Sequence, residues 1–357
     1  MKKVAILGTV GVPASYGGFE TLAQNLVDYA DKNDVNVDLS VYCSGKNPNV
    51  NHYKNARLLY IPIGANGVQS VLYDIVSLFS AVFRRNDVIL LLGVSGALIL
   101  PIIRLISNVK IVTNIDGIEW KRDKWKGIAK YFLRFSEYCA VKFSHDIIAD
   151  NQGIKDYVKE TYDYDCQVIS YGGDQAVNIE PKPFSGALPD RFALALCRIE
   201  PENNVEMILE AFSKSDFDLV FVGNWSSSEF GSTTKLKYKG FSNITLLDPI
   251  YDTGILKTIR SKACVYIHGH SAGGTNPSLV EMMHFGIPIV AYQCNFNGYT
   301  TCNDALYFHS SADLLNILNE FDKLEVLKVG LRMKDIAGIH YTWSRIGDRY
   351  FSLLCLN

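Results

Sequence analysis

One segment of the sequence has the residue types and spacing of an anion-binding loop. In HGHSAGGTNPSLVEMMHFGIPIV (268–290), a strand is expected to end at the first residues and a helix to begin at Asn276 and Pro277. Gly273 and Gly274 allow an anion to approach the backbone closely, and Thr275 directly precedes the helix start. Free N–H groups at a helix start attract phosphate. The segment therefore predicts a phosphate site at the end of a strand.

Three polar side chains beside this loop are candidates for other ligand contacts. Glu281 lies about one turn inside the expected helix, where a carboxylate can accept hydrogen bonds from ribose hydroxyls. His268 and His270 flank the loop. A single histidine at a strand end is more often structural than catalytic, and we select His270 as the one that contacts a ligand. The alternative is an ordinary strand–loop–helix unit with a glutamate on its surface, and the residues alone do not decide between the two.

A second segment offers a cation at the end of another expected strand. In FALALCRIEPENN (192–204), Arg198 directly follows the apolar run. A guanidinium can make forked hydrogen bonds to phosphate oxygens. Arg198 is therefore a candidate phosphate ligand; the alternative is a surface arginine paired with Glu200 or Glu202.

A glycine-rich loop follows the first expected strand. In GTVGVPASYGGFET (8–21), Gly17 and Gly18 would let a sugar or phosphate come close to the backbone. Val10 stands where a dinucleotide fingerprint needs its second glycine, which disfavours an NAD-dependent dehydrogenase. The alternative is a turn that only links strand to helix.

A fourth segment, TNIDGIEWKRDKW (113–125), combines acids and an aromatic ring after a strand. Asp116, Glu119 and Trp120 could form a sugar platform, because aromatic rings pack on the apolar faces of sugars. The alternative is the start of an amphipathic helix with solvated charges.

Two series of strands and helices are predicted to position these loops. Strands are expected at 3–7, 37–42, 58–61, 88–92, 109–114 and 146–149, and again at 192–197, 219–222, 244–246, 263–267 and 287–291. Helices are expected at 19–30, 69–84, 204–213 and 277–285. This alternation is typical of doubly wound parallel sheets, whose ligands bind at the carboxyl ends of the strands. The segment 172–191, rich in Pro, Gly and Asp, is the best linker candidate, so we predict one domain over 1–175 and another over 190–335.

Composition excludes some classes of protein. The net charge is -2 over 357 residues, so nucleic acid is disfavoured as a partner. The eight cysteines include no C-x-x-C pair and are interpreted as buried free thiols of a reducing compartment. The apolar stretch 88–106 is interrupted by glycines, Pro101 and Arg104, and is predicted as a buried strand and a buried helix, not a membrane span. Asp163 and Asp165 form an Asp-x-Asp pattern of the kind that can bind a metal ion. They precede a strand and lie outside the four motifs above, so we predict no metal site.

Together, the motifs GVPASYGGFET, NIDGIEWKR, RIEPENN and HGHSAGGTNPSLVE resemble glycosyltransferase family 4, which has the GT-B fold. The likeness spans nearly the whole chain and is greatest to a bacterial subgroup that includes rhamnosyltransferases of capsule and O-antigen synthesis. The family's ribose-binding glutamate falls on Glu281, and its other glutamate, which contacts the donor sugar, falls on Gly273. The arginine and lysine that neutralise the donor diphosphate fall on Arg198 and Asn203, so one glutamate and one positive charge are absent.

The resemblance implies a retaining glycosyltransferase with two doubly wound Rossmann-like domains facing a central cleft, and a C-terminal helix (336–357) packing back on the first domain. It implies no cofactor and no metal, a nucleotide-sugar donor, for which we select dTDP-rhamnose, and a glycan or polyprenyl-diphosphate-linked acceptor. Arg198 and Asp116 are the expected catalytic residues, and Asp116, Glu119 and Trp120 would bind the acceptor. The expected donor-binding residues are Gly17, Gly18, Arg198, Asn203, His270, Gly273, Gly274, Thr275, Asn276 and Glu281.

The resemblance also implies a cytoplasmic enzyme of surface polysaccharide synthesis, with peripheral contact to the inner face of the plasma membrane. The candidate for that contact is 69–85, which ends in Arg84 and Arg85, although it is predicted first as a buried helix. Two other functions remain open: an epimerase or hydrolase of sugar nucleotides with the same fold, and a sugar-nucleotide binding protein without catalytic activity.

Overall fold

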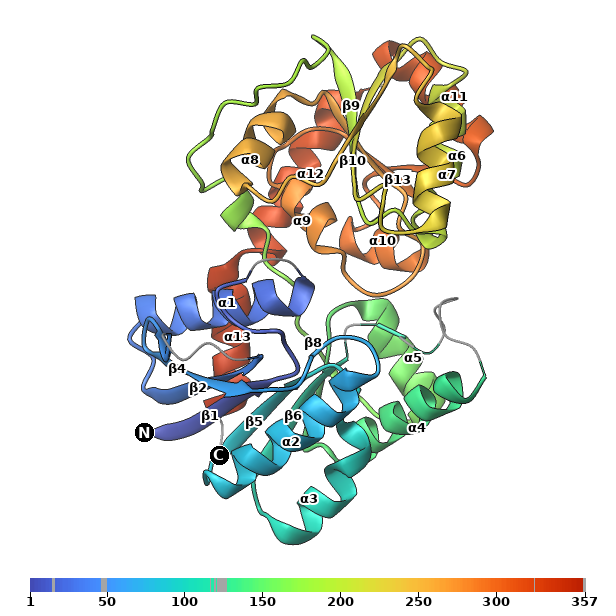
Figure 1. The fold of residues 1–357 in the computed structure, drawn as a ribbon. Coiled ribbons are helices and arrows are strands. Elements are labelled where there is room, and N and C mark those ends of the chain that lie inside the picture. The colour runs from blue at the N-terminus through green and yellow to red at the C-terminus, as the bar shows by residue number, and fades with distance from the viewer. Residues whose placement is uncertain are drawn as a thin grey trace. The chain divides into compact units, whose positions relative to one another are not determined.

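The chain forms two compact units (Figure 1). The computed structural model describes residues 1–14, 17–45, 50–115, 117–118, 120, 127–323 and 325–355. Unit 1 consists of residues 1–170 and 343–357, and unit 2 consists of residues 171–342. Each unit has its own sheet and its own buried core.

The sheet of unit 1 has the strand order β3-β4-β2-β1-β5-β6-β7-β8 within the described residues. All its pairings are parallel except that of β3 with β4. All five side chains of β5 are buried, as expected for a parallel strand covered on both faces. The strands are β1 (Lys2–Leu7), β2 (Val37–Ser44), β3 (His52–Tyr53), β4 (Ala56–Ile61), β5 (Val88–Leu92), β6 (Lys110–Ile115), β7 (Asp146–Ala149) and β8 (Gln167–Val168).

Helices cover both faces of this sheet. The chain leaves β1 in one direction and returns past β1 to β5, so right-handed crossovers place α1 on one face and α2, α3 and α4 on the other. The C-terminal helix α13 packs against α1, where the rings of Tyr29 and Phe351 stack at 5.8 Å. The helices are α1 (Gly18–Lys32), α2 (Gln69–Phe83), η1 (Ala97–Ile99), α3 (Leu100–Ile106), α4 (Ile128–Phe143), α5 (Gln152–Tyr162) and α13 (Trp343–Cys355).

The sheet of unit 2 has the order β11-β10-β9-β12-β13-β14 and is parallel throughout. Its strands are β9 (Phe192–Leu196), β10 (Asp218–Val222), β11 (Ile244–Leu247), β12 (Val265–His268), β13 (Ile289–Tyr292) and β14 (Leu306–Phe308). Its helices are η3 (Asp174–Ala176), η4 (Pro201–Asn203), α6 (Val205–Phe212), α7 (Glu229–Tyr238), α8 (Thr253–Lys262), α9 (Pro277–Met283), α10 (Asn295–Thr300), α11 (Ser311–Glu320), η5 (Phe321–Lys323) and α12 (Val326–His340).

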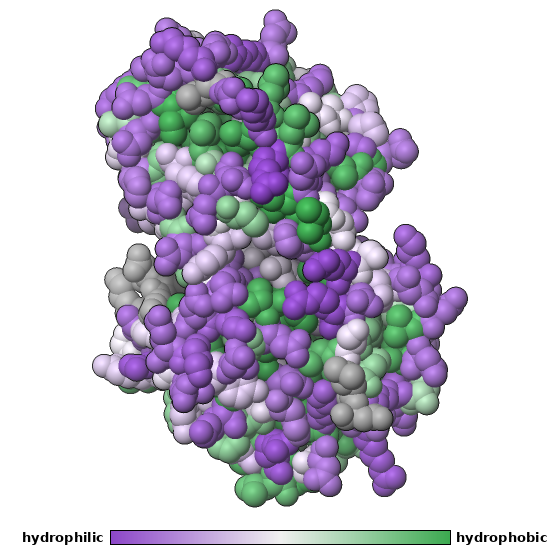
Figure 2. Space-filling model, turned by 180° about the vertical axis from the view of Figure 1, so that it is seen from behind, coloured by the Kyte–Doolittle hydropathy of each residue, from purple (hydrophilic) through white to green (hydrophobic). Residues whose placement is uncertain are grey.

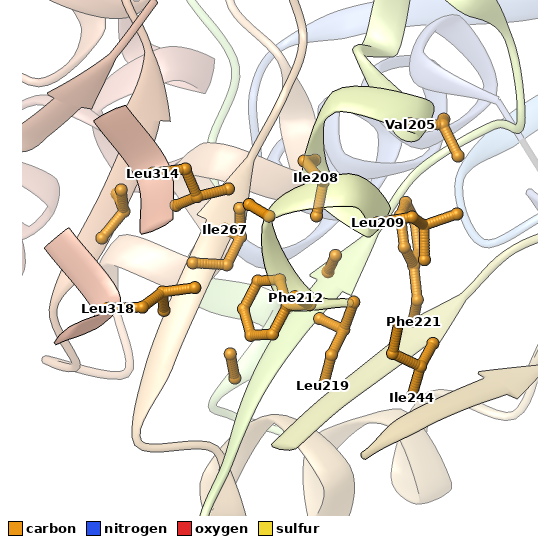
Figure 3. Packing of buried hydrophobic residues seen from close by; sticks show 14 of the residues in the cluster. Val205, Ile208, Leu209, Phe212, Leu219, Phe221, Ile244, Ile267, Leu314 and Leu318 are labelled. Carbon is orange, nitrogen blue, oxygen red and sulfur yellow. The ribbon is translucent and has the colours of Figure 1, made fainter. Parts of the chain in front are cut away.

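The core of unit 2 joins α6 and α11 to the strands behind them (Figure 3). Phe212 on α6 and Leu318 on α11 belong to one buried cluster with Leu219 on β10 and Ile267 on β12. Burying a side chain of this size contributes about 1.5–3 kcal/mol. The core therefore fixes β9 and β12, whose carboxyl ends carry the candidate site, together with β10.

The predicted fold class is confirmed: the chain has two α/β units with parallel sheets. The predicted strands end within about two residues of the observed ones, while the short strands β3, β8 and β14 were not predicted. The division between the units falls at 170/171 and 342/343, whereas the predicted domains ran from 1 to 175 and from 190 to 335. The segment 172–191 is not a free linker, because Lys257 Nζ on α8 donates to the carbonyls of Val177 and Ile179 at 2.8 and 2.6 Å.

Two helices of unit 1 are less buried than the sequence predicts. In α3 only Leu100 and Ile103 are buried, and α2 leaves Leu72 and Phe83 exposed. The sequence analysis predicted that the whole apolar run 88–106 is buried. This holds for β5 but not for most of α3, which is apolar and yet exposed. In the described part of the chain, no helix combines the length and the apolar character needed to span a bilayer.

Candidate functional site

Two loops of unit 2 leave neighbouring strands at the same edge of the sheet. Strands β9 and β12 are paired in parallel, so the β9 loop (197–204) and the β12 loop (269–276) emerge side by side. Asn204 Nδ2 donates to the carbonyl of Gly269 at 2.8 Å, and the backbone N–H and hydroxyl of Ser271 donate to the carbonyl of Glu202 at 3.0 and 2.7 Å. The two loops therefore form one connected structure.

The close approach of the loops depends on a glycine. A Cβ at Gly269 would lie 2.1 Å from the carbonyl oxygen of Asn203, which is far inside van der Waals contact. Only a residue without a Cβ fits there unless the backbone moves. The loops are thus held in register by packing as well as by hydrogen bonds.

Asn203 links the two loops through its side chain. It is 2 % exposed, and its Nδ2 donates to the carbonyl of Arg198 at 2.7 Å. This bond orients the amide so that Oδ1 faces His270 Nδ1 at 2.6 Å. Since Oδ1 only accepts, Nδ1 of His270 carries the ring proton and Nε2 carries a lone pair in the neutral imidazole. Both polar atoms of the Asn203 amide thus have partners within unit 2, and direct contact with the donor stays a prediction.

His270 occupies space beside the position where the related family has a glutamate. A Cβ built on Gly273 would lie 3.3 Å from His270 Nε2, and Gly273 has a φ of 102°. A glutamate in this conformation would be strained, and its side chain would start against the imidazole. A glutamate side chain at position 273 would therefore compete with the imidazole of His270 for the same space.

Arg198 stands at the start of the β9 loop with its guanidinium accessible. Its side chain is 44 % exposed, and Nη2 lies 3.7 Å from Glu200 Oε2. A long, exposed ion pair contributes at most about 1 kcal/mol, so a ligand anion can compete for the guanidinium. The pairing with Glu200 that we weighed as an alternative is present but weak.

The start of α9 has the cap that the sequence predicts. Asn276 Oδ1 accepts from the N–H and the hydroxyl of Ser278 at 3.0 and 2.7 Å. The hydroxyl of Tyr266, on β12, lies 3.0 Å from the Ser278 hydroxyl and ties the cap to the sheet. Helix α9 has seven residues, two fewer than the predicted 277–285, so its dipole is small. Anion binding here has to rest on the loop N–H groups around Gly274 and on Arg198.

Glu281 is part of a buried ion pair that the sequence analysis missed. Its Oε2 bonds to Arg260 Nη2 on α8, and its Oε1 accepts from Gln175 Nε2 at 2.7 Å. The two charged side chains are 8 % and 15 % exposed. Each carboxylate oxygen has two lone pairs, so Glu281 can still accept from a ribose hydroxyl while it is oriented by Arg260. Arg260 lies on α8 and Glu281 on α9, 21 positions apart, so no short-range sequence pattern reveals that they form a pair.

Two other residues of the β12 region are buried. His268 is 2 % exposed, burial holds its pKa well below the usual value, and its Nε2 has no hydrogen-bond partner within the described residues. It is therefore a neutral side chain at pH 7. Thr275 is 4 % exposed, so its contact with a donor would be made by its backbone.

The glycine-rich loop of unit 1 is held by Glu20, which the sequence analysis did not single out. Glu20 Oε1 accepts from the N–H of Val10 at 2.8 Å and from the Thr9 hydroxyl at 3.3 Å. Gly17 has a φ of 124° and caps α1, which begins at Gly18. A Cβ at Gly17 would lie 1.8 Å from Glu20 Oε2, so the glycine makes room for this carboxylate.

Of the expected acceptor residues, only Trp120 is described; Asp116 and Glu119 lie outside the described residues. The indole Nε1 of Trp120 donates to Tyr157 Oη at 3.1 Å and to Glu137 Oε1 at 3.3 Å. Lys130 Nζ and Arg134 Cζ lie 5.5 and 5.3 Å from the centroid of a Trp120 ring. Cations already stack on this side chain, which limits the ring area left for a sugar.

The described residues contain no cluster of three side chains suited to a metal ion. Asp163 and Asp165 instead pair with Lys159 and Lys155 at 2.5 and 2.8 Å on the surface of unit 1. All eight cysteines lie in the described ranges as free thiols, and Cys302 is the exposed one among them.

Comparison with known families assigns the two units differently. Residues 179–313 match the family described as "Glycosyl transferases group 1", and residues 1–174 match a "Domain of unknown function (DUF1972)". No curated protein matches the chain. Unit 2 therefore carries a glycosyl transferases group 1 domain, and the chain is a glycosyltransferase.

Solved structures show the same fold at low sequence identity. Sucrose-phosphate synthase from Thermosynechococcus elongatus has a TM-score of 0.81 at 13 % identity, covering 99 % of this chain and 98 % of its own. Trehalose-6-phosphate synthase OtsA has a TM-score of 0.74 at 9 % identity, covering 100 % and 99 %. HepE of Anabaena, in complex with UDP, has a TM-score of 0.71 at 13 % identity, covering 99 % and 100 %. The fold is GT-B.

Proposed function

We propose that the protein is a retaining glycosyltransferase that moves a sugar, rhamnose from dTDP-rhamnose as the first choice, onto a glycan or a polyprenyl-diphosphate-linked acceptor. The reaction would belong to surface polysaccharide synthesis at the inner face of the plasma membrane. The nucleotide-sugar donor is supported by the glycosyl transferases group 1 domain and by the structure of HepE with UDP. The choice of rhamnose rests on the resemblance of the four sequence motifs.

The observation that carries this proposal is the joined pair of loops at the end of β9 and β12. The β9 loop presents the accessible guanidinium of Arg198, and the β12 loop follows it with the backbone of Gly273–Asn276. In the proposed complex the donor diphosphate lies between them, and Glu281 accepts from the ribose. Arg198 then stabilises the negative charge that grows on the diphosphate as the sugar leaves, and Asp116 acts on the acceptor side.

His270 takes the role that the missing glutamate has in the related family, as we propose. Its Nε2 lies beside Gly273 and would accept a hydrogen bond from a hydroxyl of the donor sugar. Asn203 is then a positioning residue, because its Oδ1 fixes the proton on Nδ1 and so sets the tautomer of the ring. A rhamnose donor has no hydroxyl on its terminal carbon, so it makes fewer polar demands on this side of the site.

We expect dTDP-rhamnose to stabilise the protein and to be consumed only when an acceptor is present. At a concentration of about 100 times its dissociation constant, a ligand stabilises the folded state by about 2.7 kcal/mol, which corresponds to a rise in Tm of roughly 5–10 °C. Melting curves with dTDP-rhamnose, UDP-glucose and the free nucleotides rank the donors. Chromatography of the nucleotide and sugar products, with and without acceptor, then measures the reaction.

The product analysis separates the three candidate functions. Free sugar or an altered sugar nucleotide without acceptor would identify a hydrolase or epimerase. Tight binding with no turnover under any condition would identify a binding protein, and the transferase proposal would be wrong. No thermal response to any sugar nucleotide would contradict the donor site itself.

We expect Asn203→Leu to lower kcat by about tenfold through the loss of the fixed proton on His270. The ¹⁵N chemical shifts of the His270 ring nitrogens report the tautomer, and the Nδ1-protonated form should give way to a mixture. Asn203→Asp keeps an acceptor facing Nδ1 and should restore the tautomer. If Asn203→Leu left the tautomer unchanged while kcat fell, Asn203 would act only by joining the two loops.

A further inference from the structure

The face of unit 1 that carries α2, α3 and α4 exposes apolar side chains away from the sheet. On α2 the side chains of Tyr73, Ser77 and Leu78 are buried. The opposite side of the same helix carries a stripe at helical spacing, in which Leu72 and Phe83 are 55 % and 77 % exposed. The members of this stripe are Leu72, Val76, Phe79 and Phe83.

Helices α3 and α4 continue this exposed apolar surface. On α4 a second stripe at helical spacing consists of Ile128, Tyr131, Phe135 and Tyr138, which are 87 %, 75 %, 58 % and 44 % exposed. On α3, between α2 and α4, Leu105 is 85 % exposed, and Ile102 and Ile106 are also exposed. We call these residues, with Leu72 and Phe83, the outer helix face. In contrast, the side of unit 1 seen in Figure 2, from behind the view of Figure 1, is mostly hydrophilic.

The charges on this face have one sign. The exposed charged residues of α2, α3 and α4 are all basic: Arg104, Lys130, Arg134 and Lys142. Arg84 and Arg85 follow α2 directly and are exposed as well. The acids of these three helices, Asp74 and Glu137, are both buried. Burial raises the pKa of Asp74 to about 7, and Glu137 accepts hydrogen bonds from Tyr157 and Tyr162 at 2.5 and 2.6 Å.

A shallow hollow on α2 adds room for apolar groups. It has a volume of about 510 Å³ and is lined by Val76, Phe79, Ser80, Phe83 and Arg84. The rings of Phe79 and Phe83 stack along it at 6.4 Å. An apolar floor with an arginine at its edge suits an acyl chain whose anionic headgroup stays at the surface.

We propose that the outer helix face docks unit 1 on an anionic membrane surface. Exposed apolar patches of this extent mark interaction sites, and the basic residues that supply all the exposed charges of these three helices match anionic headgroups. A second copy of the same face is a poorer occupant, because it would bring basic residues against basic residues. The inference rests on unit 1 alone and does not depend on the donor site of unit 2. It replaces the candidate stretch 69–85 with a surface made by three helices.

The test compares binding to vesicles of phosphatidylcholine with and without about one third phosphatidylglycerol, by cosedimentation of the full chain. We expect binding to the anionic vesicles that weakens as salt is raised. The variant Leu105→Glu/Phe135→Glu should bind at least about tenfold more weakly. Leu327→Glu/Leu331→Glu on α12 is the matched control, since these leucines are 78 % and 62 % exposed, and it should bind like the unaltered chain.

Three results would overturn the proposal. One is no binding to anionic vesicles, and another is equal binding to vesicles of phosphatidylcholine alone. The third is an equal loss in the α12 control, which would show that any added acid disturbs binding. If the chain instead formed dimers that Leu105→Glu/Phe135→Glu dissociated, without vesicle binding, the face would be a contact between copies. Melting curves of both variants check that they remain folded.

Discussion

Replacing Arg198 with alanine is expected to lower kcat/KM for sugar transfer by about 100- to 1000-fold. The guanidinium is the cation that the β9 loop presents to the proposed diphosphate, and removing one donor that stabilises developing negative charge typically has an effect of this size. The free energy of unfolding should change by less than about 1 kcal/mol, because the side chain is 44 % exposed and its pair with Glu200 is long. Steady-state kinetics and melting curves measure the two quantities.

The control for this experiment is another exposed arginine of unit 2. Arg332 is 60 % exposed and pairs with Asp304 at 2.8 Å, so Arg332→Ala removes the same charge from the same unit. Its transfer rate should stay within about twofold of the unaltered enzyme. Arg198→Lys should recover part of the activity, since it restores the charge without the forked geometry. Full activity in Arg198→Ala would remove Arg198 from the diphosphate site.

The second large effect is expected at the buried ion pair of Arg260 and Glu281. Replacing Arg260 with alanine leaves the carboxylate of Glu281 buried without its cation, and breaking such a pair costs about 3–5 kcal/mol of folding free energy. Chemical unfolding of the full chain measures this loss. Donor affinity should fall as well, because Glu281 loses the contact that orients it for the ribose.

A double replacement distinguishes the structural role from the ribose contact. Arg260→Met/Glu281→Gln removes both charges at similar volume and should recover most of the stability, because no charge remains buried alone. Donor affinity should stay low, since an amide is a weaker partner for a hydroxyl than a carboxylate. If the double variant bound donor normally, Glu281 would serve the packing of α8 against α9 and not the ligand.

Most of the strands could be predicted from the sequence because they are short apolar runs, and several, such as β5, are buried on both faces. Runs such as 88–92 and 192–196 are best interpreted as buried strands once glycine or proline lies close to their ends. β8 and β14 escaped prediction because two or three residues carry too little pattern. The segment 172–191, the linker candidate of the sequence, belongs to unit 2, because hydrogen bonds that no local pattern reveals hold it on α8.

The candidate site was only partly predictable for a similar reason. Arg198 and the loop at Gly273 follow strands, so their approach could be inferred from parallel topology alone. In the sequence, Asn203 was notable only because it occupies the position of the family's lysine. Its contact with His270, which lies 67 positions away, could not be inferred from local pattern. Arg260 gave no signal because a basic residue late in a helix is usually solvated.

The outer helix face shows the limit of reading burial from composition. Apolar residues on both sides of α2 and α4 indicate a helix that is covered all round, and the sequence does not say whether protein or another apolar medium covers the second side. The sheet covers one side of each helix in the structure. The charges resolve the question better than hydropathy does, because the two acids of these helices point inward and the basic residues point outward.

The position of α13 in unit 1 affects the order in which the protein is made. Because residues 343–355 pack on α1 near the N-terminus, the first 170 residues leave the ribosome without the helix that completes their core. Unit 2 has all its strands before that helix is synthesised and can fold on its own during translation. Unit 1 therefore completes its core only after unit 2 has been translated, and α1 keeps an apolar surface exposed to chaperones until α13 has been synthesised.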